Sequence, residues 1–163
     1  MQILSDLELE KVAWYAVVQR EVAQLGKGHL TLFRGGETIN KWPVITGGSK
    51  IDARERSAIT PPIEWIMIES IRTRTHPKGH RMNMARIIPF GPEKSFYPNR
   101  TFSIHDWPFM IHEAGRSTGC IAVLSDYWRD CRRHLNQAYA ECTFSIYVED
   151  INKNEKQIPV MVG

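Results

Sequence analysis

One cysteine, two histidines and a turn rich in glycine and hydroxyl groups are the residues of this 163-residue chain whose types and spacing could do chemistry. Cys120 lies in the run "PFMIHEAGRSTGCIAV", eight residues after His112, and His105 ends an earlier apolar run. A cysteine attacks as its thiolate, so it needs a base or a positive charge nearby to lower its pKa. Attack on a carbonyl also requires donors for the oxyanion that forms.

The turn before Cys120 offers such donors. Gly119 lets the backbone bend tightly, and we expect the amides of Thr118, Gly119 and Cys120 to converge as an oxyanion hole. Ser117 is expected to hydrogen-bond within the loop or to orient a partner. Arg116 adds a positive charge beside the thiol, and we expect it to contact substrate. The pattern therefore predicts nucleophilic cysteine catalysis.

Two histidines compete for the role of general base. His112 is nearer the turn and is followed by Glu113, whereas His105 is followed by Asp106, which could orient an imidazole. We favour His112, because it ends a short apolar run at 108–112, expected to be a strand, that leads directly into the loop, and we keep His105 as the alternative base. Only geometry decides between them.

Other interpretations of Cys120 remain open. A cysteine after a glycine is commonly a small buried hydrophobic residue, and the chain would then be a non-enzymatic β-rich binding or structural module of a phage or secretion system. A papain-like amidase is disfavoured, because such folds place the cysteine at a helix start, with the histidine later in the chain. Cys131 and Cys142 are expected to be structural.

The elements that must position these residues are mainly strands. Periodicity predicts an amphipathic helix at 5–25, a hairpin of strands 29–33 and 38–45 around a Gly-Gly turn, and further strands within 60–73, 84–90, 101–105, 142–150 and 157–163. A helix at about 126–139 should follow a short strand after Cys120. We therefore expect one catalytic domain, 1–163, with a helical segment at 1–28 and a β-rich core at 29–163.

Composition and sequence pattern argue against several other classes of protein. Hydrophobic residues make up 42% and charged residues 24%, and the net charge of +3 is too small to indicate a nucleic-acid partner. No window approaches eighteen consecutive apolar residues, so no membrane span is expected. The first residues carry acids and lack an uninterrupted apolar core, so we expect no secretion signal and synthesis in the cytoplasm. Three cysteines without a CxxC pair argue against a disulfide scaffold and a zinc site.

The run "IHEAGRSTGCI" resembles the active-site signature of L,D-transpeptidases. The upstream runs "LTLFRGGETINKWPVITGG" and "AITPPIEWIMIES" resemble that family's opening hairpin and the segment that follows it, so the resemblance covers roughly residues 29–148. It implies a β-sandwich of the L,D-transpeptidase type and a cysteine enzyme that acts on peptidoglycan tetrapeptide stems. The expected reaction is L,D-carboxypeptidase, L,D-transpeptidase or D-amino acid exchange chemistry without metal or cofactor, with Trp107 walling the substrate cleft.

The sequence departs from the usual family pattern in three ways, two of which suggest a subgroup. Thr118 stands where most members have His, Ile63 stands near the position of a usual Gly, and the gap from His112 to Cys120 is short. Standard members place the base about twice as far upstream, which would select His105. The short gap and the missing His resemble the type VI secretion effectors of this fold. That resemblance implies an antibacterial toxin that acts in the periplasm of a target bacterium, with secretion machinery and an immunity protein as partners.

Overall fold

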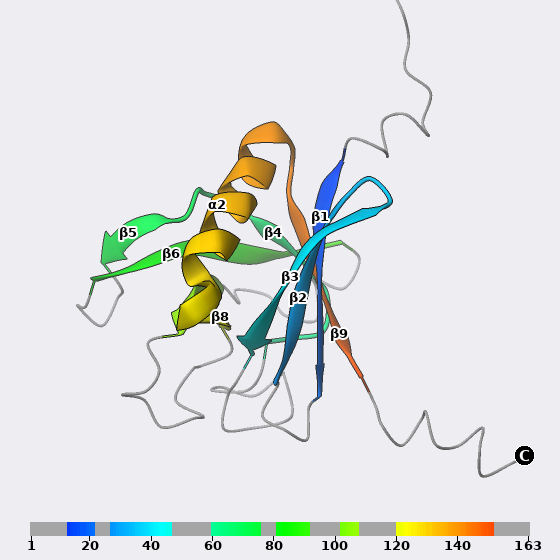
Figure 1. The fold of residues 1–163 in the computed structure, drawn as a ribbon, viewed down its shortest axis with the longest axis horizontal. Coiled ribbons are helices and arrows are strands. Elements are labelled where there is room, and N and C mark those ends of the chain that lie inside the picture. The colour runs from blue at the N-terminus through cyan, green and yellow to red at the C-terminus, as the bar shows by residue number, and fades with distance from the viewer. Residues whose placement is uncertain are drawn as a thin grey trace, which may run out of the picture.

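Strands dominate the part of the chain that the structure, a computed structural model, describes: residues 13–21, 27–46, 60–75, 81–91, 102–107 and 120–151. The elements are β1 (Trp14–Glu21), β2 (Lys27–Arg34), β3 (Glu37–Ile45), β4 (Glu64–Met67), β5 (Arg72–Thr75), β6 (Arg81–Phe90), β7 (Phe102–Trp107), β8 (Ile121–Leu124), α2 (Ser125–Glu141) and β9 (Ser145–Asp150) (Figure 1). The prediction of a β-rich fold with a helix after Cys120 is therefore confirmed.

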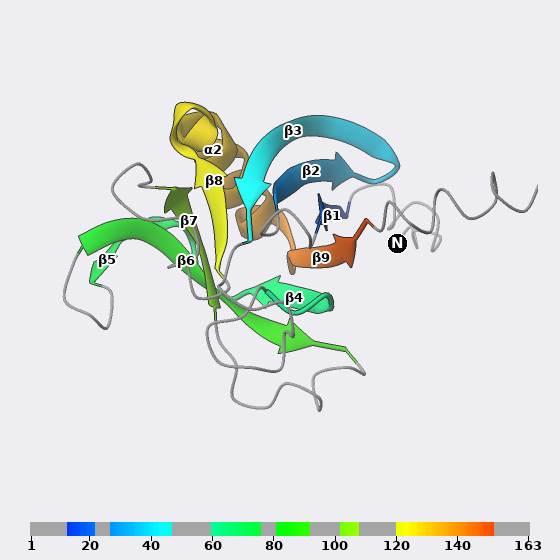
Figure 2. The ribbon, with the colours of Figure 1, turned by 90° about the horizontal axis from the view of Figure 1, so that it is seen from below.

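The nine strands form one sheet in the order β4-β9-β1-β2-β3-β8-β7-β6-β5. An additional pairing joins β4, the first strand of this order, to β6, the last but one, so the sheet curls into a closed ring with β5 appended outside it. Figure 2 shows the ring from below. The pairs β1–β9 and β7–β8 are parallel, and all the other described pairs are antiparallel.

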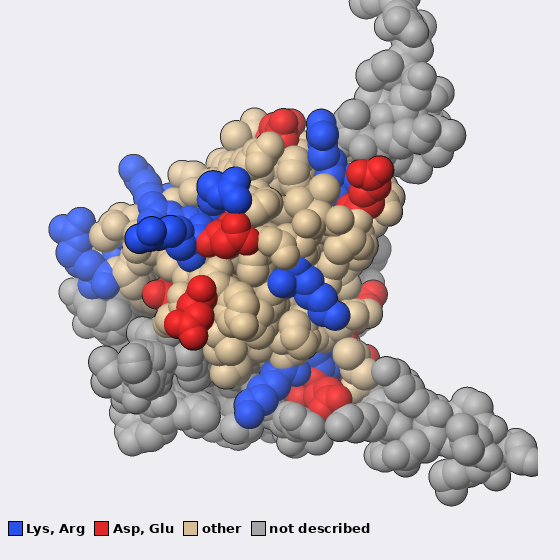
Figure 3. Space-filling model, viewed as in Figure 1, with Lys and Arg blue, Asp and Glu red and all other residues tan. Residues whose placement is uncertain are grey.

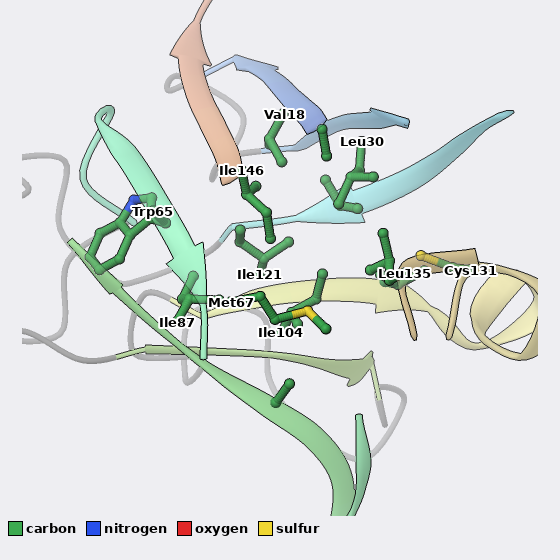
Figure 4. Close-up of a cluster of buried hydrophobic side chains, with 14 of the residues drawn as sticks. Val18, Leu30, Trp65, Met67, Ile87, Ile104, Ile121, Cys131, Leu135 and Ile146 are labelled. Atoms are coloured by element: carbon green, nitrogen blue, oxygen red, sulfur yellow. The ribbon is translucent and has the colours of Figure 1, made fainter. Parts of the chain in front are cut away.

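The inside of the ring is the hydrophobic core. Successive side chains of a strand point to opposite faces, so each strand contributes every second residue to the core and leaves the rest on the outer face. On β7, Phe102 and Ile104 join the core, which places Ser103 and His105 on the outer face. Figure 4 shows part of the core, including Val18, Leu30, Trp65, Met67, Ile87, Ile104, Ile121 and Ile146.

Helix α2 follows directly on β8 and packs against the core through one stripe. Its buried residues, Trp128, Cys131, Leu135 and Ala138, recur at helical spacing. Asp130 fixes the helix to β3, since it accepts hydrogen bonds from Trp42 Nε1 at 3.0 Å and from Asn40 Nδ2 at 2.8 Å. Because α2 is continuous with β8, these contacts also fix the strand that follows Cys120.

The predicted helix at 5–25 is wrong across residues 14–21, which form strand β1. Trp14, Ala16, Val18 and Arg20 are buried in strict alternation, which is the period of a strand. Val17 and Val18 are β-branched and favour an extended backbone. Residue 28, the predicted boundary between the N-terminal segment and the core, lies in β2, which begins at Lys27.

The hairpin prediction is confirmed by β2 and β3, which pair around Gly35 and Gly36. Gly35 has φ 60°, a left-handed conformation that glycine adopts without strain. The single strand expected within 60–73 is two strands, β4 and β5. The strand expected at 157–163 lies outside the described residues.

The surface carries charges of both signs. Figure 3 shows basic and acidic side chains interspersed on one face of the molecule, in keeping with the small net charge. Within the described ranges, no helix is both long and apolar enough to cross a membrane.

Candidate active site

Two parallel strands bring the candidate nucleophile to a serine that sequence reasoning did not single out. In the β7–β8 ladder Ile104 is the partner of Ile121, so Ser103 and Cys120 come next to each other one position earlier on both strands. The Ser103 hydroxyl donates a hydrogen bond to Cys120 Sγ over 3.3 Å. Ser103 is buried and Cys120 is half-buried.

His105 lies two residues after Ser103 on the same face of β7, and its ring interacts with the Cys120 side chain, so that each shifts the pKa of the other. Its Nδ1 lies 2.6 Å from the carbonyl oxygen of Asp106. Because a carbonyl oxygen only accepts, Nδ1 carries a proton and donates to it, which leaves Nε2 available for proton transfer. The Asp106 carboxylate in turn accepts a hydrogen bond from Ser125 Oγ at 2.9 Å.

These contacts shift the two pKa values toward an ion pair. Burial alone would raise the pKa of Cys120, but the hydrogen bond and positive charge of His105 and the hydrogen bonds from Ser103 outweigh it, so that the pKa lies below the ordinary 9.0. Burial would lower the pKa of His105, but the hydrogen bond and negative charge of Cys120, together with Asp106, raise it above 6.5. The site therefore favours a thiolate beside an imidazolium.

The other two thiols lie in different surroundings. Cys131 is fully buried in the core, and desolvation, followed by the charge of Asp130, raises its pKa well above 9.0. Cys142 is half-buried and lies near the carbonyl oxygens of Ala138 and Trp14, at 3.6 and 3.7 Å. Among the three cysteines, Cys120 is the one whose pKa a histidine lowers within the described structure.

The structure describes some of the predicted site residues and leaves others aside. Cys120 and the alternative base His105 come together, whereas the favoured base His112 lies outside the described residues, as do Arg116, Ser117, Thr118 and Gly119. Trp107 ends β7, and the structure does not describe its side chain. The role of His112 and the oxyanion turn stay predictions.

Ser103 is the residue that sequence reasoning missed. The signal for it was present in "TFSIH", because an alternating strand places residues 103 and 105 on the same face. What the sequence lacked was the parallel pairing of β7 with β8, which aligns that face with Cys120.

A cavity of about 450 Å³ lies at the ends of β1, β2 and β3. One of its lining residues, Ile45, is the ladder partner of Ala122, and Ala122 is the partner of His105. Another lining residue, Leu124, belongs to β8, so the cavity reaches the strand next to the one that carries His105. Among the described residues, no group of three or more His, Cys, Asp or Glu side chains could hold a metal ion.

Comparison with known proteins gives a family match and a structural neighbour. The family model of the YkuD L,D-transpeptidase catalytic domain matches residues 19–131, a span that includes Ser103, His105 and Cys120. The crystal structure of the helical cell shape determining protein Pgp2 from Campylobacter jejuni has a TM-score of 0.51 and 15% identity, and this likeness concerns the fold alone. The alignment covers 86% of this chain and 49% of that one, so the chain spans about half the length of its neighbour. No curated protein matches in sequence.

Proposed function

Because the chain belongs to the YkuD family of L,D-transpeptidase catalytic domains, whose reaction depends on a cysteine, we propose that it processes the stem peptides of peptidoglycan with Cys120 as the nucleophile. The observation that carries the proposal is the contact of Cys120 with His105 and Ser103, which lowers the pKa of the thiol and raises that of the imidazole. A non-enzymatic module would have no use for such a pair, since a structural cysteine in a core has its pKa raised, as Cys131 does.

In the proposed reaction, the Cys120 thiolate attacks the carbonyl carbon between the third and fourth residues of the stem. The His105 imidazolium gives its proton to the departing amine, so the peptide bond breaks, a thioester forms and the terminal D-amino acid leaves. Neutral His105 then takes a proton from water, which hydrolyses the thioester, or from an amine, which forms a new amide bond. Backbone amides of the turn before Cys120 are expected to hold the oxyanion.

We assign the base to His105 rather than to His112, because His105 makes the described contact with Cys120. His105→Ala should lower kcat/KM by about 10²–10⁴-fold, the usual effect of losing a general acid and base. His112→Ala, the matched change at the competing position, should keep most of the activity. The reverse ranking of the two variants would overturn the assignment.

The test of the activity is mass spectrometry of muropeptides with tetrapeptide stems after incubation with the protein. We expect loss of the terminal residue, or its exchange when a D-amino acid is supplied, and the two products differ in mass. Cys120→Ala should abolish both products, whereas Cys142→Ala should leave them unchanged. If the wild-type protein leaves the stems intact, or if Cys120→Ala processes them at the wild-type rate, the proposed function fails.

We further propose that the protein acts as an antibacterial effector in the periplasm of a target bacterium, with an immunity protein as its partner. This part rests on the resemblance of the turn, in which Thr118 replaces the usual His. The short gap from His112 no longer supports it, because His105 is the histidine beside Cys120. Growth arrest of a susceptible bacterium on export of the protein to its periplasm, but not on cytoplasmic expression or with Cys120→Ala, is the expected result. Normal growth in all three cases contradicts it.

A further inference from the structure

The outer face of the sheet carries arginines beside the candidate active site. In the β6–β7 ladder Arg86 is the direct partner of Ser103, and Met84 is the partner of His105. Directly opposed side chains of an antiparallel pair point to the same face, with their Cβ atoms about 4.5–5.5 Å apart. Arg86 therefore projects from the same face as Ser103, whose hydroxyl contacts Cys120.

A second arginine and a glutamate complete this group. On β5, Arg74 is the partner of Met82, which shares a face with Arg86 because the two lie four residues apart on β6. Glu69 accepts a hydrogen bond from Arg86 Nε at 2.6 Å and forms a second ion pair with Arg74. We call Glu69, Arg74 and Arg86 the arginine cluster. With two guanidinium groups and one carboxylate, it carries one net positive charge.

The two arginines differ in how they are held. Arg74 is mostly buried and also donates to the backbone, from Nε to the Met84 carbonyl at 3.2 Å and from Nη2 to the Ser70 carbonyl at 2.7 Å. Arg86 has 59% of its side chain exposed, and its one described ion pair uses Nε. Within the described residues, no carboxylate pairs with its two terminal nitrogens, which form the part of the guanidinium that can grip a carboxylate through two parallel bonds.

We propose that Arg86, oriented by Glu69, binds the free terminal carboxylate of the stem peptide, an inference that rests on the proposed function. In a substrate cleaved before its last residue, that carboxylate lies one residue beyond the attacked carbonyl, and consecutive residues are about 3.8 Å apart. Arg86 is one strand away from Ser103 and two strands away from the position of Cys120. An arginine at this position would restrict cleavage to peptides that end one residue after the scissile bond.

The kinetic experiment compares two substrates that differ in one group, a stem tetrapeptide with a free C-terminus and its C-terminal amide. For the wild type we expect kcat/KM at least tenfold higher with the free acid. Arg86→Gln should remove this preference by raising KM for the acid about 10–100-fold and leaving kcat/KM for the amide unchanged. Arg86→Lys keeps the charge but not the planar guanidinium, so its preference for the acid should lie between those of the wild type and Arg86→Gln. An acid preference that survives Arg86→Gln overturns the proposal.

Arg81→Gln is the matched control, because Arg81 is an exposed arginine of the same strand on the other face. It should leave the preference for the acid unchanged. If Arg81→Gln and Arg86→Gln lower kcat/KM for the free acid equally, the effect comes from general surface charge and the proposed subsite is wrong. Thermal unfolding midpoints of the variants should match the wild type.

A binding measurement separates this proposal from the proposed function. Cys120→Ala cannot form the thioester, so calorimetric titration of that variant with the acid and the amide reports binding alone. The acid should bind at least tenfold tighter, and Arg86→Gln in the same background should abolish the difference. If the wild type is inactive and this preference is present, the proposed reaction fails and the subsite stands. If the wild type is active and the preference is absent, the subsite fails and the reaction stands.

Discussion

The sulfur of Cys120 lies between two donors that favour its ionised form, the Ser103 hydroxyl and the His105 ring. Each donor comes from β7, and each is on the strand face that the core does not use. The same strand thus supplies a hydrogen bond that stabilises the thiolate and a cation that compensates its charge. Cys131 has neither contact, and burial raises its pKa instead of lowering it.

The paired shifts set the pH dependence of Cys120 alkylation. Because its pKa is lowered, the thiolate persists below the pH at which an ordinary thiol protonates, and because the pKa of His105 is raised, the imidazolium persists above 6.5. Iodoacetamide labelling of Cys120, followed by peptide mass spectrometry, should therefore have its midpoint below 9.0. In His105→Ala this midpoint should rise. A midpoint unchanged by the substitution would show that His105 does not stabilise the thiolate.

Ser103→Ala should raise the pKa of Cys120, because the thiolate loses a hydrogen-bond donor. A hydrogen bond to a charged group contributes about 1.5–3 kcal/mol, and 1.4 kcal/mol corresponds to roughly one pH unit. We expect the labelling midpoint to rise by about one unit and the rate at neutral pH to fall about tenfold, with recovery in alkaline buffer. Ser103→Thr keeps the hydroxyl and should stay near the wild type. Loss of activity that alkaline pH does not restore would contradict this role.

Sequence reasoning singled out Cys120 as the candidate nucleophile and His105 as one of two candidate bases, but it missed Ser103. Cys120 could be found because its turn has a recognisable local pattern. The choice between His105 and His112 depended on proximity in space, which sequence separation does not encode, and the structure describes a contact only for His105. Ser103 could not be found because it reaches Cys120 only through the parallel pairing of β7 with β8, which the local sequence does not reveal.

Among the elements, β1 is held at its end by a buried arginine. Arg20 is fully buried, and it donates from Nε to Asp150 Oδ1 at 2.7 Å and from Nη1 to Thr46 Oγ1 at 2.9 Å. It thereby joins β1 to β9 and to the residue that follows β3. This also explains the wrong helix prediction: the polar residue that ends the alternation of β1 is satisfied by a partner 130 positions away, which no local pattern reveals.

Asp150→Ala should destabilise the fold, because it leaves the Arg20 charge buried without its carboxylate partner. Removing one member of a buried pair costs about 3–5 kcal/mol, and the partial exposure of Asp150 places the expected loss near the lower limit, at about 3 kcal/mol. Glu149→Ala is the matched control, since its contact with Gln19 is an exposed hydrogen bond at 3.4 Å, and it should change stability by less than about 0.5 kcal/mol. Urea unfolding measures both. Equal losses would mean that the buried pair contributes nothing of its own.

At the scale of the whole molecule, β9 holds the ring together. It pairs with β1 on one side and with β4 on the other, and Ile146 is fully buried opposite both Ala16 and Trp65. Antiparallel hairpins such as β2–β3 could be predicted from a local turn. The closure of the ring could not, because each of its pairings joins segments far apart in sequence.

Ile146→Pro should prevent the ring from closing, because proline removes a ladder hydrogen bond in a strand paired on both sides. We expect loss of the cooperative unfolding transition and, in native buffer, rapid labelling of Cys131, which is buried in the wild type. Ile146→Val is the conservative control and should cost about 0.5–1.5 kcal/mol with Cys131 still protected. Protection of Cys131 in the proline variant would show that β9 is dispensable for the core.

The pairing of β1 with β9 has a consequence for the order of events during synthesis. A nascent chain that has been synthesised as far as α2 already contains Ser103, His105 and Cys120, yet the strand that closes the ring has still to be translated. Folds rich in such long-range pairings form slowly, because distant segments must meet before either is stabilised. Cys120 acquires its contacts with Ser103 and His105 only when β7 and β8 pair, so we expect an unfinished chain that has not yet folded to carry a thiol of ordinary reactivity.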